Sequence, residues 1–222
     1  QKLIVTSATY RQDSRAAATL LARDRDNRLL ARGPRHRLDA EVIRDNALAV
    51  SGLLIDKIGG PSVYPYHPKG LWLELNNRPG FSKPYPHGHA TGEALYRRSL
   101  YVYWKRTSPH PMMTLFDAPS REASCVRRSR TNTPLQSLAL FNEPQRIEAA
   151  RKLAERLLRE ADNDDARLDL LFILTASRPP KDIERSACSK LLQAQRTRYA
   201  STESEAQALL AIGNAPRDVK LK

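Results

Sequence analysis

The stretch NEPQRIEAARKLAERLL, residues 142–158, decides the fold class of this chain. Its apolar side chains recur at steps of three and four residues, which places them on one helix face: Ile147, Ala150, Leu153, Ala154, Leu157 and Leu158. Asn142 is expected to cap this helix, with Pro144 in the first turn and Gln145 as the capping-box partner. We therefore predict a long amphipathic helix here.

The same helical spacing continues toward the C-terminus. Further helices are predicted over about residues 164–176, 181–199 and 203–212, and they are separated by Pro179-Pro180 and ended by Gly213. Short connections between helices favour antiparallel neighbours, so we expect residues 134–222 to form an irregular helical bundle.

The N-terminal region, residues 1–58, is predicted to read as helix, loop, helix. From Leu38 to Leu54 the apolar residues again follow one helix face. The turn Gly59-Gly60-Pro61 is expected to end this helix, because glycine accommodates a left-handed cap and proline cannot continue a helix.

Residues 59–92 differ in composition from the helices on either side. They hold six of the nine glycines and six of the fifteen prolines, which indicates turns, extended pieces and loop. They also carry too much apolar surface for a disordered linker: Tyr64, Tyr66, Leu71, Trp72, Leu73, Leu75, Phe81 and Tyr85. We predict a long ordered loop packed on the helices, with a short strand near residues 71–75 and little other β structure.

Residues 93–133 form a mixed basic segment. Residues 95–106 fit the periods of a strand and of a helix equally well, and the polar run 127–134 leads directly into a helix. Taken together, the four regions predict a mainly α, single helical domain over residues 1–222 that is truncated at both ends.

The formal net charge of +13 indicates attraction to polyanions: nucleic acid, anionic lipid surfaces, or sulfated and carboxylated polysaccharide. No apolar run approaches the roughly 20 residues of a membrane-spanning helix. Cys125 and Cys188 form no CxxC pattern, so a cysteine zinc site and a c-type haem attachment are excluded in this segment. One disulfide and two free thiols both stay open.

The arginines of the mixed basic segment are the main candidate binding residues. The planar guanidinium fork grips carboxylate, sulfate or phosphate with two hydrogen bonds. Residues 127–132 precede the helix at Pro134, so they are expected to lie beside free amides at its start. The alternative is that the cationic residues pair with Glu41, Asp45, Asp117 and Glu122 to hold loops onto helices. The candidates are Arg97, Arg98, Lys105, Arg106, Arg121, Arg127, Arg128, Arg130 and Asn132.

Two other residue groups admit a functional interpretation. His87 and His89, joined by His67 or His110, have donor types that zinc or copper accepts, but the spacing does not demand a metal and we expect none. Nine of the fourteen aromatic residues lie between Tyr64 and Trp104, where they either stack on sugars or bases or fasten the long loop to the core. No hydrolase or phosphate-loop signature is present.

Several ordered motifs carry a family resemblance. They are IVTSATYRQ (4–12), NRLLARGPRHRL (27–38), AEVIRD (40–45), GGPSV (59–63), RRSLY (97–101), FDAP (116–119), RE (121–122), VRR (126–128) and TNTPLQ (131–136). In this order they resemble the planctomycete-type domain of unknown function 1553 family. One departure is Ser177, where the family often has glycine.

The resemblance implies a setting but no reaction. Such domains usually lie at the C-terminal end of exported multidomain proteins, behind a sister domain and often a cytochrome c-like domain. This implies a periplasmic, cell-envelope or extracellular location, no cofactor in this segment, and haem only elsewhere in the full-length protein.

Three functional hypotheses follow. The leading one is a non-catalytic binding or docking module that engages an anionic glycan or the cytochrome c-like domain of the same protein. The first alternative is an enzyme acting on anionic polysaccharide, with Asp117 and Glu122 as acid/base residues and Arg127 beside them. The second is nucleic-acid binding, which rests on charge alone because no helix-turn-helix or RNA-binding signature is present.

Overall fold

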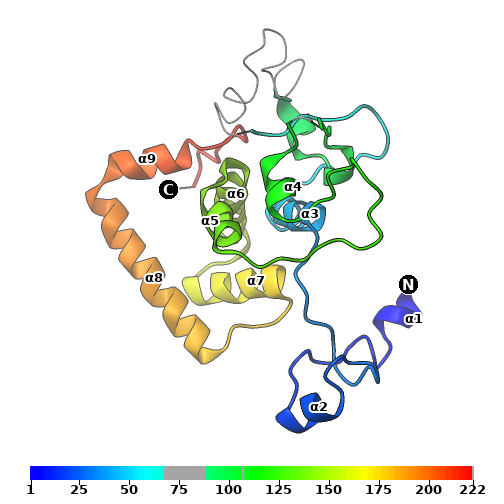
Figure 1. Cartoon of the computed structure of the whole chain (residues 1–222). Helices are drawn as coiled ribbons and strands as arrows, with labels where there is room; N and C mark the ends of the chain where they lie inside the picture. Colours follow the sequence, from blue (N-terminus) through cyan, green and yellow to red (C-terminus); the bar gives the residue numbers. More distant parts are fainter. Residues whose placement is uncertain (68–88, 107, 222) are drawn as a thin grey trace. The chain divides into compact units, whose positions relative to one another are not determined.

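The computed structural model describes residues 1–67, 89–106 and 108–221 (Figure 1). The predicted strand at 71–75 and most of the predicted loop lie outside the described residues. Within them the secondary structure is helical apart from two isolated bridges, Ile55 with Arg97 and Val63 with Val102, which confirms the mainly α fold. The chain divides into two compact units, residues 1–38 and 39–222, and each is described by itself.

The unit of residues 1–38 contains two short helices, α1 (Lys2–Val5) and α2 (Ala18–Arg23). Hydrogen bonds around Asp24 hold its loop, because this buried carboxylate accepts the amides of Arg28 and Leu29, both at 2.8 Å. The apolar side chains of residues 1–38, by contrast, are largely exposed. This unit is therefore stabilised by polar turns more than by an apolar core.

The unit of residues 39–222 is built around a helix that contacts several others. The α3 helix packs against α4, α6 and the short turn η2 (Figure 1). The α6 helix also contacts α5 and α7, and from α7 onward each helix contacts the next, α7 with α8 and α8 with α9. The elements are α3 (Ala40–Val50), η1 (Gly92–Tyr96), η2 (Ser99–Tyr101), α4 (Pro111–Leu115), α5 (Pro134–Asn142), α6 (Pro144–Glu160), α7 (Asp164–Ala176), α8 (Asp182–Ser201) and α9 (Glu203–Leu210).

Two apolar clusters line α3. One joins Leu48 and Leu53 to Leu95 of η1 and to Ala149 of α6. The other joins the first turn of α3 to Met113 and Phe116 around α4. Both clusters are small, so polar contacts contribute much of the packing between these elements.

The end of α3 differs from the prediction. The helix ends at Val50, not at the Gly59-Gly60 turn, because Gly52 adopts a left-handed φ of 76° and the amides of Leu53 and Leu54 both donate to the Leu48 carbonyl. The apolar spacing continued to Leu54 because the chain beyond the helix still faces the core.

The predicted long helix is α6, but its cap and its buried face differ from the prediction. Asn142 ends α5, and Glu143 is the N-cap, whose side chain accepts the Arg146 amide at 2.8 Å. Leu158, placed on the predicted inner stripe, is 39% exposed. The residues that α6 buries are mostly polar: Gln145, Glu148, Ala149, Arg151 and Glu155.

A fully buried carboxylate on α6 holds the chain that follows α9. Glu148 accepts hydrogen bonds from the Tyr96 hydroxyl at 2.9 Å and from the amides of Asn214 and Ala215, both at 2.6 Å. Gly213 has a φ of 94°, and a Cβ atom there would clash with the Glu148 side chain. Only glycine therefore permits this close approach.

The predicted C-terminal helices are present as α7, α8 and α9. Ser177, which ends α7, has a left-handed φ of 54°, the conformation that glycine adopts most easily at a helix C-terminus. In the part of the chain that the structure describes, no helix combines the length and apolar character needed to cross a bilayer.

Candidate functional site

The segment between α4 and α5 carries most of the candidate binding residues, and Asp117 fixes its course. The Asp117 carboxylate accepts the Thr131 amide at 2.8 Å and the Thr131 hydroxyl at 2.9 Å. Gln136 of α5 also donates to the Thr131 hydroxyl, at 3.0 Å, and to the Leu115 carbonyl. These contacts tie both ends of the segment to the first turn of α5.

The segment then presents an arginine-rich hollow with a volume of about 610 Å³. We call the residues that line it the arginine hollow: Asp39, Arg127, Arg128, Ser129, Arg130 and Thr131. Arg127 is exposed and makes no hydrogen bond or ion pair with any residue in the described ranges. The hollow therefore offers a guanidinium group that is available to a ligand.

Two carboxylates at the start of α3 face the arginine hollow. Glu41 receives two hydrogen bonds from Arg128, at 2.7 and 3.2 Å. Burial raises the pKa of the Glu41 carboxyl, but the hydrogen bonds from Arg128 more than offset this and leave the pKa below its usual value. Asp39 contacts Arg128 and Arg130 more loosely, at 3.8 Å each. Arg128 is thus paired, whereas Arg130 keeps donors for a ligand.

Two further candidate arginines lie away from the hollow, at η1 and η2. Arg97 is buried and donates to the backbone carbonyls of Lys57, Gly59 and Pro61, while its guanidinium lies 3.9 Å from the centre of the Tyr101 ring. The Arg98 Nε atom lies 3.9 Å from the Asp45 carboxylate. Arg97 therefore holds the turn at residues 57–61 and presents no donors to solvent anions.

Arg106 and Arg121 have partners of their own. Arg106 forms an ion pair with Glu122, and this contact lowers the pKa of the Glu122 carboxyl. The Arg121 guanidinium lies over the Trp104 ring, 4.9 Å from its centre. Lys105 and Asn132 belong to the same mixed basic segment. Glu122 pairs with Arg106, and Asp117 accepts hydrogen bonds from Thr131. Their acid/base role stays a prediction of the sequence.

The first turn of α5 is partly capped by its own residues. The Thr133 amide donates to the Gln136 side chain at 3.2 Å, the Gln136 amide donates to the Thr133 carbonyl at 3.1 Å, and Pro134 has no amide hydrogen. An anion site beside free amides at this helix start stays a prediction of the sequence.

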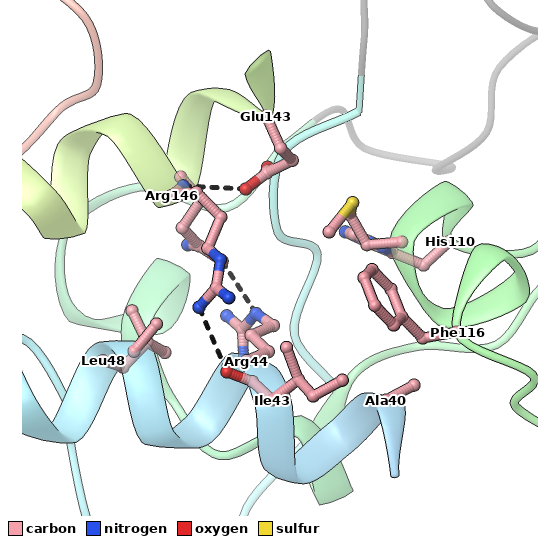
Figure 2. Close-up of a pocket in the computed structure, with 11 residues that line it drawn as sticks. Ala40, Ile43, Arg44, Leu48, His110, Phe116, Glu143 and Arg146 are labelled. Carbon is pink, nitrogen blue, oxygen red and sulfur yellow. Dashed lines mark hydrogen bonds between the residues drawn. The ribbon is translucent and has the colours of Figure 1, made fainter. Parts of the chain in front are cut away.

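A second, buried polar group lies between α3 and the start of α6 (Figure 2). Arg44, 8% exposed, donates to the Gln145 side chain and the Leu95 carbonyl, both at 2.7 Å, to the Arg97 carbonyl at 2.9 Å and to the Ser99 hydroxyl at 3.2 Å. The cavity beside it measures about 20 Å³, the space of a single water molecule. The sequence reasoning did not single out Arg44, because an arginine in an amphipathic helix ordinarily faces solvent.

Histidines line the same region. His110 and His67 are buried, and their rings meet edge to face with centroids 5.1 Å apart, while His89 lies 6.3 Å from His67. Burial, followed by repulsion from His89, lowers the pKa of His67 to about 4. Among the described residues no three His, Cys, Asp or Glu side chains form a metal-binding group, and His87 lies outside them. Cys125 and Cys188 are free thiols.

Comparisons with known proteins place the chain in one family. No curated protein and no solved structure matches it. A model of the PSD1 family, described as "Protein of unknown function (DUF1553)", matches residues 1–192. The match covers most of the 222 residues and agrees with the motifs quoted above, so the chain belongs to this family of proteins of unknown function.

Proposed function

We propose that this chain is a non-catalytic docking module whose arginine hollow binds a polyanion, with a sulfated or carboxylated glycan as the ligand. The observation that carries the proposal is the exposed Arg127, which has no partner among the described residues, beside the loosely held Arg130. An arginine already paired at short distance gains little from a new anion, whereas these two can exchange water for a charge-assisted hydrogen bond.

Several features support a polymer over a small ion. The hollow is open and large, at about 610 Å³, and it belongs to a chain with a net charge of +13. Such a field attracts extended anions over distances that a single contact does not reach. The exported location and the cytochrome c-like neighbour stay predictions of the family resemblance.

The experiment is binding of dextran sulfate, with uncharged dextran as the reference polymer, by titration calorimetry at rising salt. We expect dextran sulfate to bind and its affinity to fall as salt screens the arginines. In the double variant Arg127→Gln with Arg130→Gln, affinity should fall by at least about tenfold, since a hydrogen bond to a charged group contributes about 1.5–3 kcal/mol.

The matched control is Arg11→Gln with Arg23→Gln, which removes the same two charges from exposed positions in the unit of residues 1–38. We expect it to retain most of the affinity. Equal losses in the two double variants, or binding that ignores salt, would show that net charge alone attracts the polymer and would contradict the proposal.

A further inference from the structure

A groove bordered by α3, α5, α6 and α7 has the features of a small-molecule site. Its volume is about 350 Å³, within the range of about 300–1,000 Å³ that ligand sites occupy. Val50 of α3, Leu140 of α5 and Leu153 of α6 supply its larger apolar walls, with alanines between them. The groove shares no residue with the arginine hollow.

Arg146 of α6 brings a positive charge to the groove lining. Its Nη1 donates to the Ile43 carbonyl at 3.3 Å, which places the guanidinium against α3 one turn before Ala47, a residue of the groove wall (Figure 2). The Arg146 Nε and Nη2 atoms have no hydrogen-bond partner in the described part of the chain, and neither is sealed from solvent. The guanidinium therefore keeps donors for a ligand at this end of the groove.

The charges around the groove favour an anionic ligand. Its lining, within the described residues, contains no acidic side chain. Glu143 accepts the backbone amide of Arg146 and lines the neighbouring small cavity instead. Burial lowers the pKa of the Arg146 guanidinium, and the charge of Glu143 opposes this only in part. A partly desolvated cation of this kind gains most from an anion that forms charge-assisted hydrogen bonds.

Asn46 offers a second donor at the same end. It lies on α3 three residues after Ile43, lines the groove and is exposed, and its side chain makes no hydrogen bond with the described residues. A guanidinium fork and an amide together match the planar oxygens of a carboxylate. Because Arg146 supplies one positive charge, a monoanion leaves no surplus charge beside the apolar walls.

From this geometry we propose that the groove binds a small monocarboxylate with an apolar tail. The carboxylate accepts hydrogen bonds from Arg146 and Asn46, and the tail lies against Val50, Leu140 and Leu153.

The test uses three probes, hexanoate, 1-hexanol and acetate, each titrated into the full chain and followed by ligand-observed NMR. Hexanoate should bind about fivefold or more tightly than 1-hexanol, which lacks the charge, and than acetate, which lacks the tail. Equal affinity for hexanoate and 1-hexanol, or for hexanoate and acetate, overturns the proposal.

Two charge variants locate the carboxylate. Arg146→Gln should reduce the affinity for hexanoate to that for 1-hexanol, while 1-hexanol binding persists. The matched control Arg159→Gln removes the same charge from α6 outside the groove lining and should leave hexanoate binding within about twofold. The double variant Arg127→Gln with Arg130→Gln should also retain hexanoate binding. A loss of hexanoate binding in that double variant but not in Arg146→Gln would place the anion in the arginine hollow and overturn the proposal.

A third pair of variants locates the tail. Ala150→Trp should obstruct the groove and abolish binding of hexanoate and 1-hexanol, whereas the control Ala187→Trp, on an exposed face of α8, should not. Circular dichroism confirms that each variant is folded. Hexanoate binding that survives Ala150→Trp overturns the proposal.

Discussion

Arginine has opposite roles in two regions of this molecule. Between α3, η1 and α6, the Arg44 guanidinium is enclosed and donates four hydrogen bonds to described residues, two of them to backbone carbonyls. In the arginine hollow, Arg127 is exposed and makes none with the described residues, and Arg130 has one loose contact at 3.8 Å. The difference teaches that the net charge of +13 overstates the positive charge on the surface, because some of the arginines that contribute to it are buried.

The comparison has an energetic side. A buried charge costs several kcal/mol to desolvate and is tolerated only when its donors are satisfied. An exposed guanidinium has no such cost, but it also contributes little to stability. We therefore expect the two regions to respond in opposite ways to the same substitution.

The largest effect should follow Arg44→Met. The substitution keeps much of the side-chain volume but removes the donor to the Arg97 carbonyl and to the Gln145 and Ser99 side chains. The Leu95 carbonyl keeps the Gln145 side-chain amide as a donor. We expect a loss of about 3–5 kcal/mol in the free energy of unfolding, as for other broken buried networks. Urea denaturation followed by circular dichroism measures this. A loss below about 1 kcal/mol would mean that the network does not hold α3 to η1.

Acid should produce the next largest effect, and it should act through the buried His67 and His110. The folded chain keeps His67 neutral down to a pKa of about 4, whereas the unfolded chain takes up a proton near pH 6.5. Because the unfolded state then binds more protons, the free energy of unfolding should fall as the pH drops from 6.5 to 4, by about 3 kcal/mol. His110, whose pKa is also lowered, adds to the same trend.

The variant His67→Phe isolates that contribution. Its urea midpoint should change less between pH 7 and pH 4.5 than the midpoint of the parent chain. His36→Phe, in the unit of residues 1–38, serves as the matched control for the loss of one imidazole. An identical acid response in the parent chain and His67→Phe would assign the effect to other groups.

The smallest effect should follow Arg127→Met, the same substitution in the exposed region. We expect the free energy of unfolding to stay within about 0.5 kcal/mol, since the side chain has no partner to strand. The same urea experiment measures it, side by side with Arg44→Met. A loss above about 1 kcal/mol would remove the contrast between the two regions and would indicate a structural role for Arg127.

Much of the helical architecture could be predicted from the sequence, because helices α6 to α9 follow apolar spacing and α7 ends at Ser177, just before Pro179-Pro180. The buried face of α6 could not be predicted in this way. Apolar spacing pointed to a face that includes Leu158, whereas the chain buries Glu148 and Arg151. Both depend on partners far away in the sequence, among them the Tyr96 hydroxyl and the Ala215 carbonyl, and no local pattern encodes these.

The candidate site was predictable in the same partial way. The run of arginines after residue 126 identified the arginine hollow, since a dense cationic segment before a helix is visible in sequence. Which arginine is paired was not visible, because Glu41 and Asp39 reach the hollow from α3, more than eighty residues earlier.

The contact between Glu148 and the residues after Gly213 joins the end of the chain of C-terminal helices back to α6, where that chain begins. The chain leaves α6, passes through α7, α8 and α9, and returns to α6, where a buried carboxylate clasps its backbone. As a result α8, which buries none of its residues, is tethered at both ends. A single peptide-bond break in the turn before α8 would leave the two pieces associated through the hydrogen bonds between Glu148 and the backbone after Gly213. One cleavage there should therefore not release α8 and α9.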